Sequence, residues 1–474
     1  MWDAINRGLA LALVTTPLLI ACGGGSPSNP GAINAPQCSG SSCTGEGPPP
    51  QGTVASLCPA TADIGSNTYL GGAGSGEVVR LNINATAMTY TLSWLESPIP
   101  LATGTVSPSR QGVQITGPVA HPPAGALPTA EQTRCAFMLE PGTGSGPNGS
   151  YSTTAEFNAA NPPTIFVGNG VAGGGIPGAT VEFDGLTILV LTGVGAVPNR
   201  HFDFYPFLGF ASTTTDITKL PGTYNGLLYH LTPSNNYLTV GTNTTETFDA
   251  SGTCTSTNTP NPAYSPNAGG CLSTGNPWTL DTNGYFDSTQ APQIVTQTSL
   301  PLIGQTGKSG VAHMILGQLN GTTIPLVVRT GNVNLGTAPL HTDAQVDDES
   351  GLALLAQATP LASGGFDGGY VGADSNFNYT ATLINGGTGS FVNPGTSSAE
   401  DGFSLTYGVS ASPGLVGVTA QTTGGGTANG YAIATGGLYA ILIQGEENNG
   451  VTSTSTNSTT AQSPYFGVGA QVSK

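Results

Sequence analysis

The sequence predicts an all-β fold, and three features of its composition and pattern carry that prediction. Charged residues make up only 7% of the 474 residues, against about 25% in typical soluble proteins, so a helical surface laced with ion pairs is excluded. The 71 Gly and 36 Pro residues interrupt helices and favour turns. Two-residue turns separate runs of apolar, β-branched and aromatic residues at several places. We expect antiparallel meander modules, each a barrel or a sandwich, with an irregular β-propeller as the alternative.

Four candidate hairpins mark the expected strands. In each, a two-residue turn that favours positive φ lies between two strand-like runs, which is the strongest local signal for a hairpin. The hairpins are Ala179–Phe183 with Leu186–Leu191 around Asp184-Gly185, Val311–Leu319 with Thr322–Val328 around Asn320-Gly321, Tyr431–Thr435 with Leu438–Ile443 around Gly436-Gly437, and the shorter Trp278–Asp281 with Tyr285–Asp287 around Asn283-Gly284. A Tyr close to glycines precedes the first three hairpins, so a degenerate threefold repeat stands beside coincidence as an explanation.

One short helix is predicted among the strands. Asp347-Asp348-Glu349 would form an acidic first turn before the apolar run Leu352–Ala358, and Pro360 would stop the helix. We expect this helix to link the second module to the third.

The N-terminal stretch Leu9–Ala21 is apolar and ends at Leu19-Ile20-Ala21-Cys22. It is shorter than the ~20 residues that a membrane-spanning helix needs, and its length fits the hydrophobic region of a signal peptide. The four residues resemble the lipobox of bacterial lipoproteins. The resemblance implies that Cys22 carries a diacylglyceryl thioether and becomes the first residue of the mature chain. The alternative is an ordinary secretory signal in which Cys22 happens to fall at the cut.

The resemblance also implies an address. In such lipoproteins an Asp after the cysteine favours retention in the inner membrane, and here that residue is Gly23. We therefore expect a lipid-anchored protein of the outer membrane, on its periplasmic face or at the cell surface. The acyl chains on Cys22 would be the membrane contact.

Composition shifts divide the chain into five parts. Residues 1–21 form the signal peptide, and residues 22–57 form a Gly/Ser/Pro-rich tether that we expect to be disordered because it cannot bury a core. Three β modules follow, over residues 58–215, 216–359 and 360–474, the second with the short helix at its end.

Seven cysteines fit an exported, oxidising setting. If Cys22 is acylated, six cysteines remain for disulfides, and six allow 15 connectivities. Nearest neighbours in sequence suggest the pairs Cys38–Cys43, Cys58–Cys135 and Cys254–Cys271. A structural zinc site is disfavoured because no Cys-x-x-Cys spacing occurs.

The formal charge of −17 disfavours nucleic acid as a partner, because no basic patch could neutralise phosphates. No cofactor motif is present, so we expect no cofactor. Acidic pairs at Asp347-Asp348, Glu400-Asp401 and Glu446-Glu447 could ligate calcium or could simply be solvated loops. The metal content is left open.

Two histidines pair with aspartates at strand spacing. His201 and Asp203, and likewise His341 and Asp343, would lie on one face of a strand. Such a pair could orient a catalytic base or ligate a metal, or it could be a polar position of a half-buried strand. No Gly-x-Ser-x-Gly motif supports a hydrolase. The aromatic run Phe202–Phe210 would pack a core or line a ligand groove.

Two functions follow from these observations. The first is a non-enzymatic binding or structural module of the cell envelope, whose partner is another envelope component, a glycan or a host molecule. Its support is the scarcity of ionisable groups and of catalytic motifs. The second is a secreted hydrolase with a dispersed site at His201, Asp203, His341 and Asp343.

Overall fold

The structure is a computed structural model whose described residues form almost entirely antiparallel β-sheet. It describes residues 58–443 and 465–473, apart from gaps at 103–107, 125, 128–129, 184–185, 189–190, 195–196, 233–237, 257–270, 272–276, 292–309, 332, 335–344, 347–349, 376, 393–398, 409, 411 and 422–426. Its two principal sheets and a closed barrel confirm the predicted all-β class and its barrel form. The predicted signal peptide and tether lie outside the described residues.

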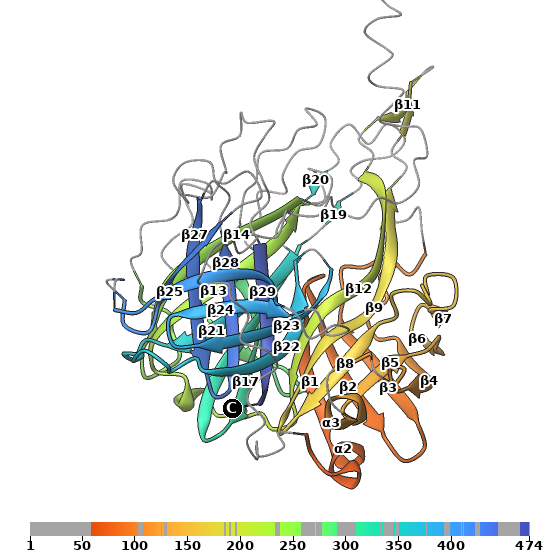
Figure 1. Cartoon of the computed structure of the whole chain (residues 1–474). Helices are drawn as coiled ribbons and strands as arrows, with labels where there is room; N and C mark the ends of the chain where they lie inside the picture. Colours follow the sequence, from red (N-terminus) through yellow and green to blue (C-terminus); the bar gives the residue numbers. More distant parts are fainter. Residues whose placement is uncertain are drawn as a thin grey trace, which may run out of the picture.

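The N-terminal sheet closes into an eight-stranded ring, here called the first barrel (Figure 1). Around the ring the strands are β3 (Thr89–Glu96), β2 (Glu77–Asn84), β1 (Thr68–Ala73), β12 (Val197–Phe210), β9 (Val171–Phe183), β8 (Thr164–Gly168), β5 (Ala136–Leu139) and β4 (Gln114–Ala120). Pairing of β4 with β3 completes the ring. The strands β6 (Thr143–Gly146) and β7 (Gly149–Ser152) extend outward from β4.

Side-chain alternation explains why these segments form a barrel. Strand β3 buries Tyr90, Leu92 and Trp94 on one face, while the residues between them are half-exposed. A period of two is what a strand with one buried face requires. Two short helices, α2 (Thr61–Ser66) and α3 (Ala130–Arg134), lie against this barrel.

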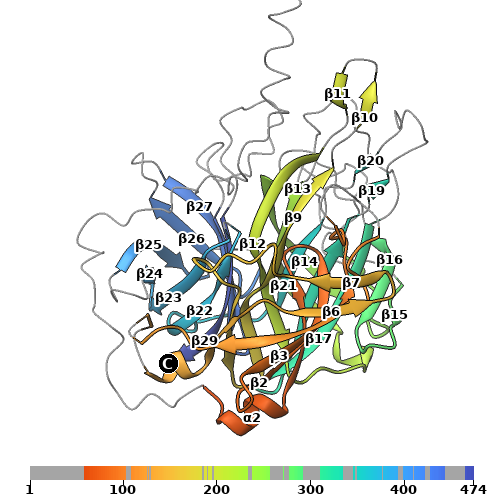
Figure 2. The same ribbon diagram turned by 90° about the vertical axis from the view of Figure 1, so that its right-hand side faces the viewer.

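The hairpin predicted around Asp184-Gly185 is wrong. Strand β9 pairs instead with β12, in a register that joins Phe183 to Val197 and Val171 to Phe210. Between them the chain forms a separate small hairpin of β10 (Leu186–Ile188) and β11 (Leu191–Val194), which stands at the far end of the long strands (Figure 2). The local turn signal therefore marks an insertion within a longer hairpin.

The middle of the chain forms a seven-stranded sheet. In sheet order its strands are β14 (Leu238–Phe248), β13 (Gly222–Thr232), β21 (Ser350–Gln357), β18 (Thr322–Thr330), β17 (Gly310–Leu319), β16 (Phe286–Ala291) and β15 (Thr279–Leu280). A 3₁₀ turn, η2 (Ile217–Lys219), precedes it, and β19 (Val333–Asn334) pairs with β20 (Gln345–Val346) beside it. The hairpins predicted around Asn320-Gly321 and Asn283-Gly284 are confirmed.

The linker helix predicted with Leu352–Ala358 as its apolar run is also wrong, because residues 352–357 of this segment belong to β21, an interior strand of the sheet. Leu352 and Leu354 pack toward the rest of the molecule, whereas Ala353 and Leu355 pack on the opposite face of the sheet. A strand buried on both faces reads as a continuous apolar run, which periodicity does not distinguish from a buried helix.

The C-terminal part is a closed eight-stranded meander, the second barrel. Its strands are β22 (Gly368–Asp374), β23 (Tyr379–Asn385), β24 (Thr388–Val392), β25 (Ala399–Thr406), β26 (Val416–Gln421), β27 (Thr427–Thr435), β28 (Leu438–Ile443) and β29 (Tyr465–Ser473). Pairing of β29 with β22 closes it. The hairpin predicted around Gly436-Gly437 joins β27 to β28 and is confirmed.

The three bodies share one hydrophobic core cluster, which includes Leu81 of the first barrel, Leu354 of the seven-stranded sheet and Leu442 of the second barrel. The aromatic run in β12 serves this core: the ring of Phe204 stacks on that of Tyr379 at 4.3 Å between centroids, across the contact between the two barrels. Close packing also explains a glycine at position 74, where a side chain would collide with the Tyr229 hydroxyl. These contacts make the described body a single packed scaffold.

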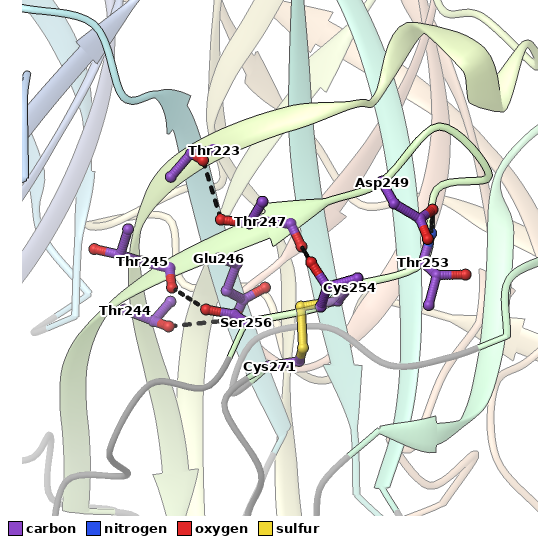
Figure 3. Close-up of a disulfide and its surroundings, with 11 residues drawn as sticks. Thr223, Thr244, Thr245, Glu246, Thr247, Asp249, Thr253, Cys254, Ser256 and Cys271 are labelled. Carbon is purple, nitrogen blue, oxygen red and sulfur yellow. Dashed lines mark hydrogen bonds between the residues drawn. A yellow bond between two sulfur atoms is a disulfide. The ribbon is translucent and has the colours of Figure 1, made fainter.

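Two disulfides lie in this body, Cys58–Cys135 and Cys254–Cys271. The second lies beside the edge strand β14, where Cys254 forms a β-bridge with Phe248 (Figure 3). Hydroxyl side chains on and next to β14 fasten this region: Thr223 and Thr247 share a hydrogen bond of 3.0 Å, and Ser256 donates one of 2.8 Å to the carbonyl of Thr245.

Candidate functional site

A cluster of polar side chains lies where β9 and β12 leave the first barrel. The two strands continue beyond their neighbours in the ring (Figure 1), and their register places His201 directly opposite Thr180. Asp203 follows two residues later on the same face of β12. The sequence prediction that His201 and Asp203 share a face therefore agrees with the structure, which brings Glu156 and Thr180 to the same place.

His201 lies between two carboxylates. Its Nδ1 is 3.1 Å from Oε2 of Glu156, and its Nε2 is 3.1 Å from Oδ1 of Asp203. The hydroxyl of Thr180 donates to the same Glu156 oxygen at 2.5 Å and lies 3.0 Å from His201 Nδ1. The three ionisable side chains are 20–23% exposed, so the cluster is accessible from solvent while partly shielded by protein.

Two asparagines complete the cluster. Asn158 and Asn161, both in the loop between β7 and β8, donate hydrogen bonds of 3.1 and 2.9 Å to the two carboxylate oxygens of Asp203. Because Glu156 comes from the same loop, the cluster fastens residues 156–161 to strand β12. We call it the loop clasp.

Electrostatics favour opposite charges on His201 and Glu156 in the loop clasp. The hydrogen bond to Glu156 raises the pKa of His201, and the negative charge of Asp203 raises it further against the opposing effect of burial. The hydrogen bond from His201 in turn lowers the pKa of Glu156. The two carboxylates thus favour the protonated imidazolium form of His201, and the imidazolium in turn favours the ionised form of Glu156.

The chemistry of the loop clasp resembles a Thr–His–Asp relay only in its distances. A general base must be neutral and must accept the proton of the nucleophile. Here His201 favours its protonated form, and the Thr180 hydroxyl points its proton at Glu156. The arrangement is suited to holding a loop.

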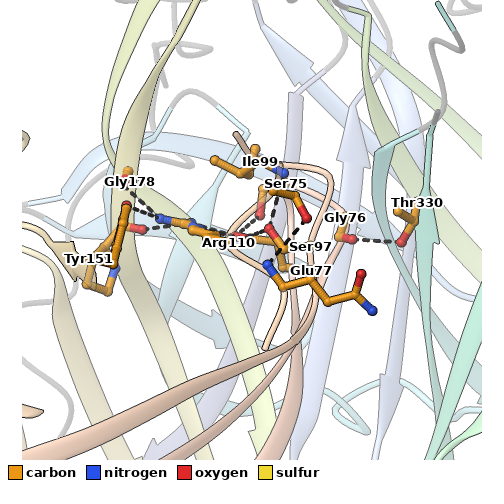
Figure 4. A network of polar contacts seen from close by, with 12 residues as sticks. Ser75, Gly76, Glu77, Ser97, Ile99, Arg110, Tyr151, Gly178 and Thr330 are labelled. Atoms are coloured by element: carbon orange, nitrogen blue, oxygen red, sulfur yellow. Dashed lines mark hydrogen bonds and ion pairs between the residues drawn. The ribbon is translucent and has the colours of Figure 1, made fainter. Parts of the chain in front are cut away.

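A second ionic pair is fully buried in the first barrel. Glu77 and Arg110 form a bidentate pair, with both N–O distances 2.7 Å and both side chains 0% exposed (Figure 4). Arg110 also donates to the carbonyls of Pro177 and Gly178 on β9 and lies over the ring of Trp94. This pair ties the segment before β4 to two sides of the barrel. Sequence reasoning missed it, because residues 77 and 110 carry no local pattern that links them.

Two further histidines, and the other residues singled out from sequence, do not join the loop clasp. His313 faces Asp287 at 2.6 Å in the seven-stranded sheet, and His121 faces the carbonyl of Ala136 in the first barrel. His341 and Asp343 lie outside the described residues, as do Cys22, Cys38 and Cys43. Of the acidic pairs, Glu400-Asp401 lies in β25, and the other two also fall outside the described part.

No metal site is found among the described residues: no three His, Cys, Asp or Glu side chains are arranged to hold a metal ion. In the loop clasp the reason is geometric, since the two ring nitrogens of His201 face different carboxylates and the three groups do not converge on one point. Within the described part of the chain, no helix has the length and apolar character needed to cross a membrane.

These features define a class: an all-β scaffold protein of two barrels and a connecting sheet, whose ionisable groups fasten loops and strands. By sequence, the chain belongs to the family described as "Protein of unknown function (DUF2957)", whose model matches residues 89–470. No curated protein matches the chain.

Solved structures with a weak likeness include two mutants of the vaccine antigen Transferrin Binding Protein B from Haemophilus parasuis Hp5. A double mutant is 12% identical with a TM-score of 0.22, covering 84% of this chain and 66% of that one. A single mutant is 11% identical with a TM-score of 0.17, covering 83% and 66%. The chain thus spans just under two thirds of those proteins, and likenesses at this level carry no argument about function.

Proposed function

We propose that this protein is an outer-membrane lipoprotein, anchored through Cys22, whose β body is a non-enzymatic binding module for another envelope component, a glycan or a host molecule. The stretch Leu19–Cys22 and the Gly/Ser/Pro-rich residues 22–57 support the anchor and the tether. A tether of that composition would hold the body away from the lipid surface.

The observation that supports a non-enzymatic role is the position of His201 between two carboxylates, 3.1 Å from each. His201 is the best candidate for a general base among the described residues, yet two carboxylates favour its protonated form. The buried Glu77–Arg110 pair is likewise committed to packing. Ionisable groups that satisfy one another stabilise a scaffold, and a rigid scaffold presents a binding surface at low entropic cost.

A secreted hydrolase is the second candidate, favoured by the 3.0 Å contact between Thr180 and His201 and the 3.1 Å contact between His201 and Asp203. It predicts ester or peptide hydrolysis that increases as His201 loses its proton at alkaline pH. Loss of such activity in both Thr180→Ala and His201→Asn would support it. No activity in the wild type at any pH between 6 and 10 would dismiss it.

Two experiments test the main proposal. Labelled palmitate should enter the wild-type chain and not Cys22→Ala, and the variant should leave the outer-membrane fraction. Equal labelling of both chains would remove the anchor. For the binding role, the full chain displayed on cells should be cross-linked to envelope and host fractions, with Cys22→Ala cells as the control. Failure to capture any component from either fraction would overturn it.

A further inference from the structure

A cavity of about 400 Å³ lies where tight turns of the three bodies meet. The β8–β9 turn brings Asn169, the β17–β18 turn brings Asn320, and the β27–β28 turn brings Gly436 and Gly437. Val171, Leu319 and Gln471 complete the lining. Its size falls within the ~300–1,000 Å³ range of small-molecule sites, and none of these residues belongs to the loop clasp.

Backbone conformation sets the shape of the cavity. Asn320 and Gly321 have φ values of 50° and 77°, and Gly436 and Gly437 have values of 59° and 95°. Positive φ at both central positions is what a tight two-residue hairpin turn requires. The backbones of these turns therefore lie close to the cavity. At the glycines no side chain fills it.

Hydrogen bonds within and between the bodies keep the walls in place. Asn320 donates to the carbonyl of Gly436 at 2.7 Å, which ties the seven-stranded sheet to the second barrel. The backbone N–H of Gln471 donates to the backbone carbonyl of Gly437 at 2.8 Å. The side-chain Nε2 of Gln471 donates to the backbone carbonyl of Asp367 at 3.0 Å. On the other wall, Ala211 donates to the carbonyl of Gly170 at 2.9 Å. A cavity built this way is formed before any ligand arrives.

The lining selects a chemical class of ligand. Three carboxamides, from Asn169, Asn320 and Gln471, offer both N–H donors and carbonyl acceptors. None of the lining residues is charged, so an ionic ligand would lose hydration without gaining a counter-charge. The chain's net charge of −17 also repels anions at a distance. Val171 and Leu319 supply the apolar part of the lining, which suits the C–H faces of a sugar ring.

We propose that this cavity is a binding site for a short neutral glycan. The inference rests on the proposed binding function and narrows it to one ligand class and one place in the fold. The hydroxyl groups of the glycan would exchange hydrogen bonds with the carboxamides, and its uncharged character would match the lining.

The test titrates the full chain, in detergent, with neutral disaccharides (lactose, maltose and chitobiose) and with acidic sialyllactose, by calorimetry. We expect at least one neutral disaccharide to bind and sialyllactose to bind at least tenfold more weakly. Asn169→Trp, which places a bulky ring in the cavity, and Gln471→Ala should each weaken binding at least tenfold. Gln114→Ala, which removes an exposed carboxamide from β4 of the first barrel, is the matched control and should leave binding unchanged. Thermal unfolding of each variant shows that it is folded.

Three results would overturn the inference: no binding of any neutral disaccharide, tighter binding of sialyllactose, or binding that survives Asn169→Trp. If cross-linking still captures an envelope or host component from cells that display Asn169→Trp, the wider binding role stands and only this site falls. If the wild type captures nothing, the proposed function fails with it.

Discussion

Tyr285 of the seven-stranded sheet donates a hydrogen bond of 2.8 Å to Oε1 of Glu96 on strand β3 of the first barrel. The contact joins residues 189 positions apart, and Gln111 donates to the second oxygen of the same carboxylate at 2.7 Å. Burial raises the pKa of Glu96. The charge of His313 and the hydrogen bond from Tyr285 lower this pKa, but they offset the effect of burial only in part. The interface between barrel and sheet thus depends on a partly shielded carboxyl group.

Tyr285→Phe should weaken this interface. Removing the hydroxyl leaves one carboxylate oxygen without its donor, which typically costs about 1–3 kcal/mol of unfolding free energy. Denaturant unfolding measures the loss. A double-mutant cycle with Glu96→Ala, which removes the acceptor, isolates the pair. Additive effects of the two substitutions would show that the contact contributes nothing.

Arg110→Met should be among the most destabilising single substitutions in the described body. It leaves the Glu77 carboxylate buried without its partner, and breaking a buried pair from one side costs about 3–5 kcal/mol. The double variant Glu77→Leu with Arg110→Met should lose less than either single variant, because no buried charge remains. Denaturant unfolding of all three compares them. A loss below ~1 kcal/mol for Arg110→Met would contradict the structural role of the pair.

The loop clasp should make stability depend on pH. A raised pKa means that His201 holds its proton more tightly in the folded chain than in the unfolded chain. Its contribution to the free energy of unfolding is therefore complete below the ordinary pKa of 6.5 and is lost as pH rises through the raised pKa. For Glu156, whose pKa is lowered, the contribution is present above the ordinary value of 4.5 and is lost as pH falls through the lowered value.

His201→Gln should therefore destabilise the chain more at pH 6 than at pH 9. Because the side chains are partly exposed, we expect a difference of only about 0.5–1 kcal/mol. Thermal unfolding at the two pH values measures it. The same substitution made in a Glu156→Gln background should show a smaller difference, because only Asp203 then faces His201. An equal loss at both pH values for the single variant would exclude the ionic role of His201.

The two disulfides should differ in their effect. Cys254 and Cys271 are 17 residues apart and Cys58 and Cys135 are 77 apart, for which chain entropy alone predicts losses of about 3 and about 4.5 kcal/mol. Replacing each pair by serines and comparing thermal unfolding under oxidising conditions tests the order. A greater loss from the shorter loop would show that packing at β14, and not chain entropy, dominates.

Local signals predicted the local parts of this fold. The turns at Asn320-Gly321 and Gly436-Gly437 were readable because two adjacent residues with positive φ determine a hairpin by themselves. The pairing of β9 with β12 was not readable, because an inserted hairpin separates strands that meet only in three dimensions. Strand β21 was mistaken for a helix because burial on both faces removes alternation.

The loop clasp, too, could be predicted from sequence only where its residues are neighbours in the chain. His201 and Asp203 could be placed on one face because they are two residues apart on one strand. Glu156 and Thr180 could not be assigned, since one lies in a loop and the other depends on the β9–β12 register. The cavity between the three turns depends on how three bodies pack, for which the sequence holds no local signal.

The closure of both barrels has a consequence for how the chain folds while it is being made. Strand β1 must wait for β12, and β22 must wait for β29, so each barrel stays open until a strand much further along the chain has been made. A polypeptide that leaves the cell interior amino end first would thus spend much of its passage with unsealed sheet edges, which invite mispairing with other chains. We expect the removal of strand β29 to hinder folding of the second barrel more than an equal cut within residues 22–57.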